Sequence, residues 1–265
     1  MTPFWSRIAV AVIGLPVVFG IVWEGGWWLF ALAAVVGLLA LHEFYALVRP
    51  LRPVVLAGFA AVLLTLVGAH RGGIAWMAAG FFVSLPVAFV LKGFADTRAP
   101  VTISVATTML GAGWVGFGLA HLLLLRDIPE NGRLASFTVL IAVFAADTAA
   151  YLVGRLVGRR RLAPTISPGK TWEGFIAGAA TAVFVAWISL YKTGFVDGGR
   201  SILLGAVIAV VGPLGDLFES SIKREMNVKD SGRILAGHGG MLDRIDALLF
   251  ASVASYYLIA GFDAA

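Results

Sequence analysis

Nine apolar stretches follow one another along this chain of 265 residues, and each is about long enough to cross a bilayer. A hydrocarbon core about 30 Å thick takes roughly 20 residues of helix. Because backbone polar groups in lipid must be hydrogen-bonded within the chain, each stretch is predicted to be an α-helix. We therefore predict an all-α, polytopic integral membrane protein with nine transmembrane helices, at residues 5–23, 27–48, 54–70, 73–91, 101–125, 134–154, 173–191, 201–221 and 245–262.

The composition supports a bilayer as the solvent. Charged residues make up 13% of the chain and hydrophobic residues 60%, whereas a soluble domain carries about 25% charged residues. No polar block is long enough to fold separately, so residues 1–265 are predicted to form one membrane-embedded domain. Within it, 1–133 supply N-terminal helices, and 134–265 supply the catalytic helices and cytoplasmic loops. The absence of cysteine excludes disulfides and thiolate metal sites.

The distribution of basic residues predicts the orientation. Fifteen Lys and Arg residues fall on one side of the predicted helices and five on the other. Because cytoplasmic loops carry the excess of basic residues, the N-terminus is predicted in the cytoplasm and the C-terminus outside. The net charge of +5 is then a membrane-surface bias and predicts no nucleic-acid partner. The charged loops 155–172 and 222–244 fall on the cytoplasmic face, where we expect them to meet.

A stretch dense in charge and glycine, 216–246, lies between two of the apolar runs. Ionisable groups beside lipid-embedded helices indicate function. Glycines and Pro213 predict a bent or unwound helix end just before Asp216. If the helix continues, Asp216, Ser220 and Lys223 share one face. A frayed, solvated helix end is the alternative, but it does not explain a carboxylate inside the apolar turn.

The centre of this stretch predicts a phosphate-binding loop. Gly239 and Gly240 beside His238 would let backbone N–H groups approach a ligand closely. Arg224 and Lys229 supply positive charge for phosphate. An ordinary connecting loop remains the alternative.

Four aspartates are candidate ligands of a divalent cation. Asp243 and Asp246 lie three positions apart at the start of the last apolar run, with Arg244 between them. Helix capping would account for Asp243 but less well for Asp246. Asp147 lies inside the sixth apolar run, where a carboxylate indicates function, although a hydrogen bond to a neighbouring helix is an alternative. With Asp216, these carboxylates suit Mg²⁺ beside phosphate groups.

A second anion site is predicted where the seventh apolar run begins. Ser167 and Lys170 precede it, and Thr171 is placed to cap the helix. Free N–H groups at a helix start, together with a lysine, favour an anion. A capped helix with a lysine reaching the interface is the alternative. For the polar pair His42 and Glu43, a catalytic role is the less favoured interpretation.

The polar positions resemble the signature of phosphatidate cytidylyltransferases, also called CDP-diacylglycerol synthases. The matching run is S-S-I-K-R-x4-K-D-S-G-R-I-L-x-G-H-G-G-M-L-D-R-I-D, from Ser220 to Asp246. D-T-A-A-Y-L-V-G-R, S-P-x-K-T-W-E-G and G-D-L-F-E-S lie upstream of it. The resemblance covers about Asp147 to Asp246, and the first half of the chain matches only as apolar spans.

The resemblance implies that the chain joins CTP and phosphatidic acid into CDP-diacylglycerol and pyrophosphate, with Mg²⁺ required and a second cation left open. With the orientation predicted from the basic residues, we expect a cell (inner) membrane protein with its active site facing the cytoplasm; a homodimer is left open. The expected catalytic residues are Asp216, Asp243, Asp246, Lys223 and Arg224, and the expected metal ligands are Asp216, Asp246, Asp243 and Asp147. The expected substrate-binding residues are Ser167, Lys170, Thr171, Ser220, Lys229, His238, Gly239, Gly240 and Arg244.

Two other functions stay open at this point. An ion-coupled secondary transporter would use the intramembrane aspartates as ion sites, although such sites usually lie near the midplane within repeats. Another membrane phospholipid transferase would use a different nucleotide, because no residue type by itself distinguishes cytosine.

Overall fold

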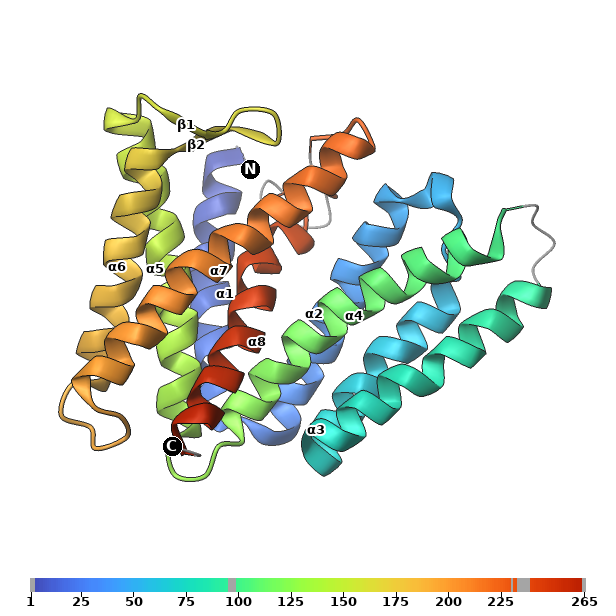
Figure 1. Ribbon diagram of the computed structural model, residues 1–265, viewed down its shortest axis with the longest axis horizontal. Helices are drawn as coiled ribbons and strands as arrows, with labels where there is room; N and C mark the ends of the chain where they lie inside the picture. Colours follow the sequence, from blue (N-terminus) through green and yellow to red (C-terminus); the bar gives the residue numbers. More distant parts are fainter. Residues whose placement is uncertain (1–2, 95–98, 230, 233–238, 264–265) are drawn as a thin grey trace. The chain divides into compact units, whose positions relative to one another are not determined.

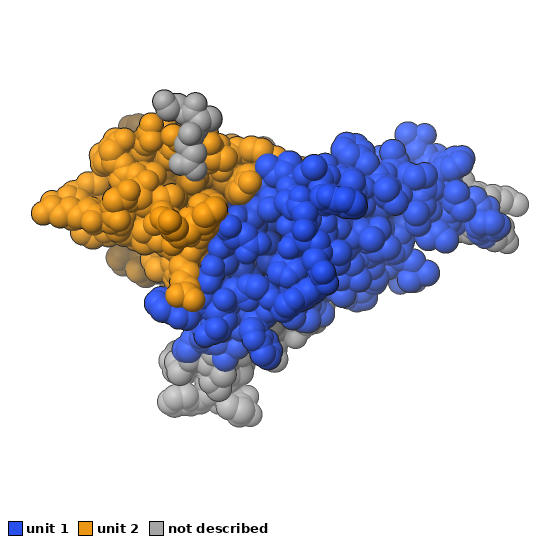
Figure 2. Space-filling model, turned by 90° about the horizontal axis from the view of Figure 1, so that it is seen from below, with its two compact units in different colours: residues 1–127, 226–245 blue, residues 128–225, 246–265 orange. Residues whose placement is uncertain are grey.

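The computed structural model describes residues 3–94, 99–229, 231–232 and 239–263, and for 3–13 and 263 the backbone alone. It is a helical structure with one short β-hairpin (Figure 1). The chain divides into two compact units, coloured separately in Figure 2. Unit 1 comprises 1–127 and 226–245, and unit 2 comprises 128–225 and 246–265.

Unit 1 contains the helices of the N-terminal half of the chain. They are α1 (Pro3–Glu24), α2 (Gly26–Leu47), the short 3-10 helix η1 (Arg49–Leu51), α3 (Val55–Phe94) and α4 (Val101–Arg126). The segment 226–241 and the first turn of α8 (Leu242–Asp263) also belong to this unit.

Helix α3 is a hairpin of two limbs rather than one straight helix. Its chain leaves helical geometry at Gly73, which has φ 69° and ψ −154°, a conformation that glycine adopts readily. Gly68 lies against the backbone of Trp76, and Gly80 lies against the carbonyl of Leu64. The predicted helices 54–70 and 73–91 are therefore the two limbs of α3.

The core of unit 1 joins α2, α3 and α4 through aromatic rings set against glycines. The Tyr45 hydroxyl donates to the Thr108 carbonyl at 2.8 Å. Its ring fills the space where Gly58 lacks a side chain, and the Phe44 ring does the same at Gly111. Small residues at helix contacts let the backbones approach closely in a bilayer.

Unit 2 is built from α5 (Gly132–Val157), α6 (Trp172–Leu190), α7 (Gly198–Glu225) and most of α8. Strands β1 (Arg161–Ala163) and β2 (Ser167–Thr171) form an antiparallel hairpin between α5 and α6. Helices α5 and α6 approach closely at two glycines: Gly174 lies against the Ala150 carbonyl of α5, and Gly178 lies against the Ala146 carbonyl. The hairpin itself was not predicted.

The prediction of a polytopic, all-α membrane protein is confirmed. Seven helices within the described residues are long and apolar enough to cross a membrane, with α3 counted once and α1 outside that set. The count of nine crossings and the orientation of the termini stay predictions.

The helix end before Asp216 was expected to be bent or unwound. The unwinding is contradicted, because α7 continues as a helix from Gly198 to Glu225 through Pro213, and a bend stays a prediction. Gly215 has another reason to be glycine, because its Cα faces the backbone of Asp246 on α8, where a Cβ would overlap the carbonyl.

Candidate functional site

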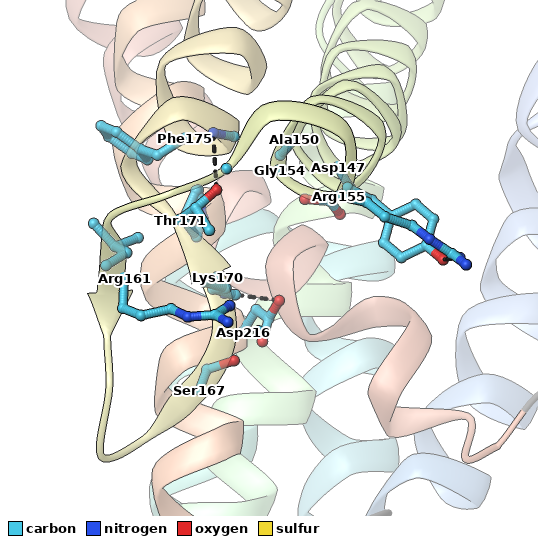
Figure 3. A pocket seen from close by; sticks show the side chains of 16 residues that line it. Asp147, Ala150, Gly154, Arg155, Arg161, Ser167, Lys170, Thr171, Phe175 and Asp216 are labelled. Atoms are coloured by element: carbon cyan, nitrogen blue, oxygen red, sulfur yellow. Dashed lines mark hydrogen bonds and ion pairs between the residues drawn. The ribbon is translucent and has the colours of Figure 1, made fainter.

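A charged pocket of about 600 Å³ lies in unit 2, at the end of the helices that carries the hairpin (Figure 3). Three basic side chains, Arg155, Arg161 and Lys170, share this pocket with Asp147 and Asp216. Its remaining lining residues are Ala150, Tyr151, Gly154, Gly158, Leu162, Ser167, Gly169, Thr171, Gly174, Phe175 and Pro213.

The hairpin is held in place by the first turn of α6. The Glu173 carboxylate accepts from the backbone N–H of Arg159 at 3.1 Å and from that of Arg160 at 3.3 Å. Thr171 caps the helix, since its hydroxyl accepts from Gly174 N at 3.2 Å. This capping role was predicted and is confirmed. Strand β2 consequently fixes the backbone of Lys170 at the pocket wall.

The ammonium of Lys170 contacts the carboxylate of Asp216, with Nζ 2.8 Å from Oδ2 (Figure 3). The Ser220 hydroxyl donates to Oδ1 of the same carboxylate at 3.3 Å. The predicted shared face of Asp216 and Ser220 is thus confirmed. Lys170 and Asp216 are both partly exposed, with 23% and 36% of their side chains accessible, so a ligand in the pocket can reach them.

Carboxylates on three helices of unit 2 interact electrostatically: Asp147 on α5, Asp216 on α7 and Asp246 on α8. Asp246 is 7% exposed and accepts from Ala247 N at 2.7 Å. Glu219 is buried nearby on α7. Hard oxygen donors of this kind suit Mg²⁺. Within the described residues, however, no three acidic or histidine side chains are close enough together to hold an ion without rearrangement.

Lys223 and Arg224, both expected to be catalytic residues, make contacts inside unit 2. The Lys223 ammonium is mostly buried and lies 3.1 Å from the Glu219 carboxylate. The Arg224 guanidinium donates to the Ile166 carbonyl of the hairpin at 3.1 Å. The expected meeting of the two charged loops is therefore found for the part of the second loop that belongs to α7.

Two basic pocket residues, Arg155 and Arg161, were missed by the sequence reasoning. Asp147, Tyr151 and Arg155 follow one another at four-residue spacing, so a helical reading of α5 would have placed all three on one face. The Arg155 guanidinium donates to the Tyr151 hydroxyl at 2.7 Å. Arg161 carried no such signal, because its position depends on the unpredicted strand β1.

Residues 226–245 are the part of the signature run that belongs to unit 1, and we call this segment the signature loop. Two carboxylates accept hydrogen bonds from its described residues. Asp243 Oδ2 accepts from Gly240 N at 3.1 Å and from Ser231 N at 3.4 Å. Gly239 has φ 82°, and a Cβ at Gly240 would overlap the Ser231 hydroxyl. These glycines are therefore required by the loop's own geometry. Lys229 and Arg244 are exposed, and His238 lies outside the described residues.

Glu43 of α2 is the second carboxylate and was not predicted to take part. It is 2% exposed, and its Oε2 accepts from Leu242 N, at the start of α8, at 2.9 Å. Its other oxygen and the Ser231 hydroxyl have no hydrogen-bond partner among the residues that the structure describes. The sequence signal was only an acidic residue near the end of an apolar run.

Together these features define a polytopic membrane protein with a charged pocket whose lysine, arginines and carboxylates suit phosphate groups and a cation. The chain belongs to the cytidylyltransferase family, whose sequence model matches residues 5–262. It is similar to the phosphatidate cytidylyltransferase of Mycobacterium bovis, with 34% identity over 96% of this chain and 88% of the relative. The Staphylococcus haemolyticus phosphatidate cytidylyltransferase is 33% identical over 92% and 94%, respectively. That of Bacillus subtilis is 39% identical over 58% of this chain and 57% of its own length.

Proposed function

We propose that the chain transfers the cytidylyl group of CTP to phosphatidic acid, giving CDP-diacylglycerol and pyrophosphate. The observation that carries the proposal is the pocket of unit 2, which places Lys170 and two arginines beside aspartates at the end of lipid-spanning helices. The name of the similar proteins, phosphatidate cytidylyltransferase, indicates the two substrates. The family also argues against a secondary transporter.

The chemistry needs positioning more than proton transfer. An oxygen of the phosphatidate phosphate forms a bond to the α-phosphorus of CTP, and the bond from that phosphorus to the β-phosphate bridge breaks. The attacking oxygen is already anionic at neutral pH, so no general base is required. The barrier arises from bringing two anions together and from charge on the departing pyrophosphate, which fixed cationic groups stabilise.

Within this proposal the pocket residues have distinct tasks. Lys170, Arg155 and Arg161 neutralise phosphate oxygens, and Ser167 donates a hydrogen bond. In the signature loop, Gly239 and Gly240 allow the backbone to approach the nucleotide, with His238, Lys229 and Arg244 around it. Arg224 holds the hairpin against α7 through its contact with Ile166, and Lys223 neutralises the buried Glu219 within α7.

Mg²⁺ is the cation that we propose for the acidic side. Asp216 and Asp246 would hold it, with Asp147 and Asp243 as further oxygen donors. The fit rests on the donor set, because carboxylate oxygens are hard ligands that suit Mg²⁺ and Asp246 interacts electrostatically with Asp216 and Asp147. When bound, Mg²⁺ supplies charge stabilisation for the pyrophosphate leaving group. Lys170 would then exchange Asp216 for a phosphate oxygen.

We further propose nine membrane crossings, with α3 contributing two, the N-terminus in the cytoplasm and the C-terminus outside. The hairpin and the signature loop then face the cytoplasm from the cell's inner membrane. The basic residues of these loops support this orientation. Cytoplasmic CTP would reach the pocket directly, and the lipid would enter from the bilayer.

The proposal is tested by supplying the purified, detergent-solubilised protein with phosphatidic acid, Mg²⁺ and one labelled nucleoside triphosphate at a time. We expect a labelled liponucleotide with CTP, equimolar pyrophosphate, and far slower turnover with ATP, GTP and UTP. Product with another triphosphate in preference to CTP would assign the protein to a different transferase. No product with any triphosphate would contradict the proposal.

A further inference from the structure

An apolar groove of about 730 Å³ runs along unit 2 between α6 and α7. Among the described residues, those that line it carry neither a charge nor a hydroxyl group. Its small residues are Ala179, Ala180, Ala206 and Ala209, and its bulkier walls are Phe175, Ile176, Val183, Phe184, Trp187, Ile202 and Val210.

The groove follows from how the two helices pack. At Gly205 of α7 the helices approach so closely that a Cβ would overlap the backbone of Val183 on α6. Beside this contact, alanines at 180 and 206 leave space that Ile176 and Phe184, both more than half exposed, enclose from the sides. The close contact at Gly205 therefore limits the width of the groove, and the large side chains form its walls.

The groove adjoins the charged pocket. Phe175 lines both of them, and on α7 the pocket residue Pro213 lies one turn from the groove residue Val210. Along α6 the groove extends from Phe175 to Trp187, which is about 18 Å of helix at 1.5 Å per residue. One leaflet of hydrocarbon is about 15 Å thick. The groove therefore has about the length of one leaflet, and at its Phe175 end it adjoins the pocket that contains Arg155, Arg161 and Lys170.

We propose that this groove binds one acyl chain of the lipid substrate, with the lipid phosphate in the adjoining pocket. The inference rests on the proposed function and extends it by assigning the α6–α7 groove as the chain subsite. A phosphomonoester lipid matches both halves, since its anionic head needs the basic side chains and its tail needs an apolar channel. An annular lipid that merely surrounds the protein would have no reason to require the charged end.

Filling the groove tests the proposal. Ala180→Leu and Ala206→Leu place larger side chains in the hollow, and Ala260→Leu adds the same group on an exposed face of α8 outside it. We expect each groove variant to raise the KM for dioleoyl phosphatidate about tenfold. This fold-change corresponds to the binding free energy lost when about two buried methylenes are displaced. The KM for dihexanoyl phosphatidate and for CTP should stay unchanged, and Ala260→Leu should match wild type throughout.

A binding experiment separates this inference from the activity. Phosphatidate with a photoactivatable group in its acyl chain should crosslink to 175–210 in wild type, and short-tailed phosphatidate should compete less well than dioleoyl phosphatidate. Competition by phosphatidylcholine as strong as by phosphatidate would reduce the groove to an annular lipid site. Equal KM changes for long and short lipids would overturn the proposal, and an accompanying change of oligomeric state would assign the groove to a second copy. If wild type crosslinks as expected but does not turn over CTP, only the proposed reaction fails.

Discussion

The ion pair between Lys170 and Asp216 lies in a pocket that also contains Arg155 and Arg161. Each partner of the pair is the type of group that a nucleotide and its metal ion bind: a cation for phosphate and a carboxylate for the metal. Ligand binding would therefore replace the contact between Lys170 and Asp216 by two others, one between Lys170 and a phosphate group and one between Asp216 and the metal ion. The proposed exchange accounts for the partial exposure of both side chains in a chain that is otherwise poor in charge.

Replacing Lys170 by methionine should reduce the stabilisation of the transition state without unfolding unit 2. Lys170→Met keeps the aliphatic stem but removes the charge, so we expect kcat/KM for CTP to fall about 100-fold. Lys192→Met removes the same charge from an exposed turn and serves as the control. Steady-state rates of CDP-diacylglycerol formation measure the effect. Equal rates for the two variants would exclude Lys170 from phosphate binding.

Glu43 is expected to act as a positioning residue for the signature loop. Glu43→Ala removes the acceptor of the Leu242 N–H, which should cost about 1–3 kcal/mol and lower kcat at least tenfold. Glu43→Gln keeps an amide oxygen in the same place and should restore most of kcat. Both variants need rate measurements and thermal unfolding in detergent. Rates that follow stability alone, with no rescue of kcat by glutamine, would reduce Glu43 to a packing role.

At the scale of elements, the β-hairpin places Lys170 and Arg161 in the pocket. It is short, and Glu173 of α6 anchors it through the backbone of Arg159 and Arg160. Sequence patterns predicted the neighbouring helices because apolar runs of about 20 residues are unambiguous. They did not predict strands of three and five residues in a charged loop, since so short a stretch carries no periodicity.

The contact between α7 and α8 depends on the absence of a side chain at Gly215. Gly215→Ala places a Cβ against the carbonyl of Asp246, so we expect a loss of about 1–3 kcal/mol of stability. Gly261→Ala changes the same residue type within α8, where a Cβ meets nothing within 4 Å, and should be neutral or slightly stabilising. Thermal unfolding midpoints in detergent test the pair. Similar midpoints for the two variants would contradict the close packing.

At the scale of the whole molecule, the sequence predicted the polytopic helical architecture and many residues of the candidate site. Asp147, Ser167, Lys170, Thr171 and Asp216 were all predicted, and all line one pocket. Such residues stand out because charge is rare in apolar surroundings. Contacts such as that of Glu43 with Leu242 span 199 positions and could not be predicted, because no local pattern specifies a long-range partner.

The proposed orientation can be measured directly because the chain contains no cysteine. Thr165 lies in the exposed turn of the hairpin, and Asp197 lies in the exposed loop at the other end of α6. In intact cells, a membrane-impermeant maleimide should label Asp197→Cys, and it should label Thr165→Cys only after permeabilisation. The reverse pattern would invert the proposed topology and place the pocket outside the cell.

The central claim is that carboxylates of α7 and α8 serve the transfer of a nucleotide to a lipid phosphate. Asp246→Asn removes the charge of a buried carboxylate while keeping its size and its acceptor for Ala247 N. Asp197→Asn makes the same change at an exposed position next to Arg200. With CTP, phosphatidic acid and Mg²⁺, we predict no detectable CDP-diacylglycerol from folded Asp246→Asn and wild-type rates from Asp197→Asn. Near-normal product formation by Asp246→Asn would contradict the account.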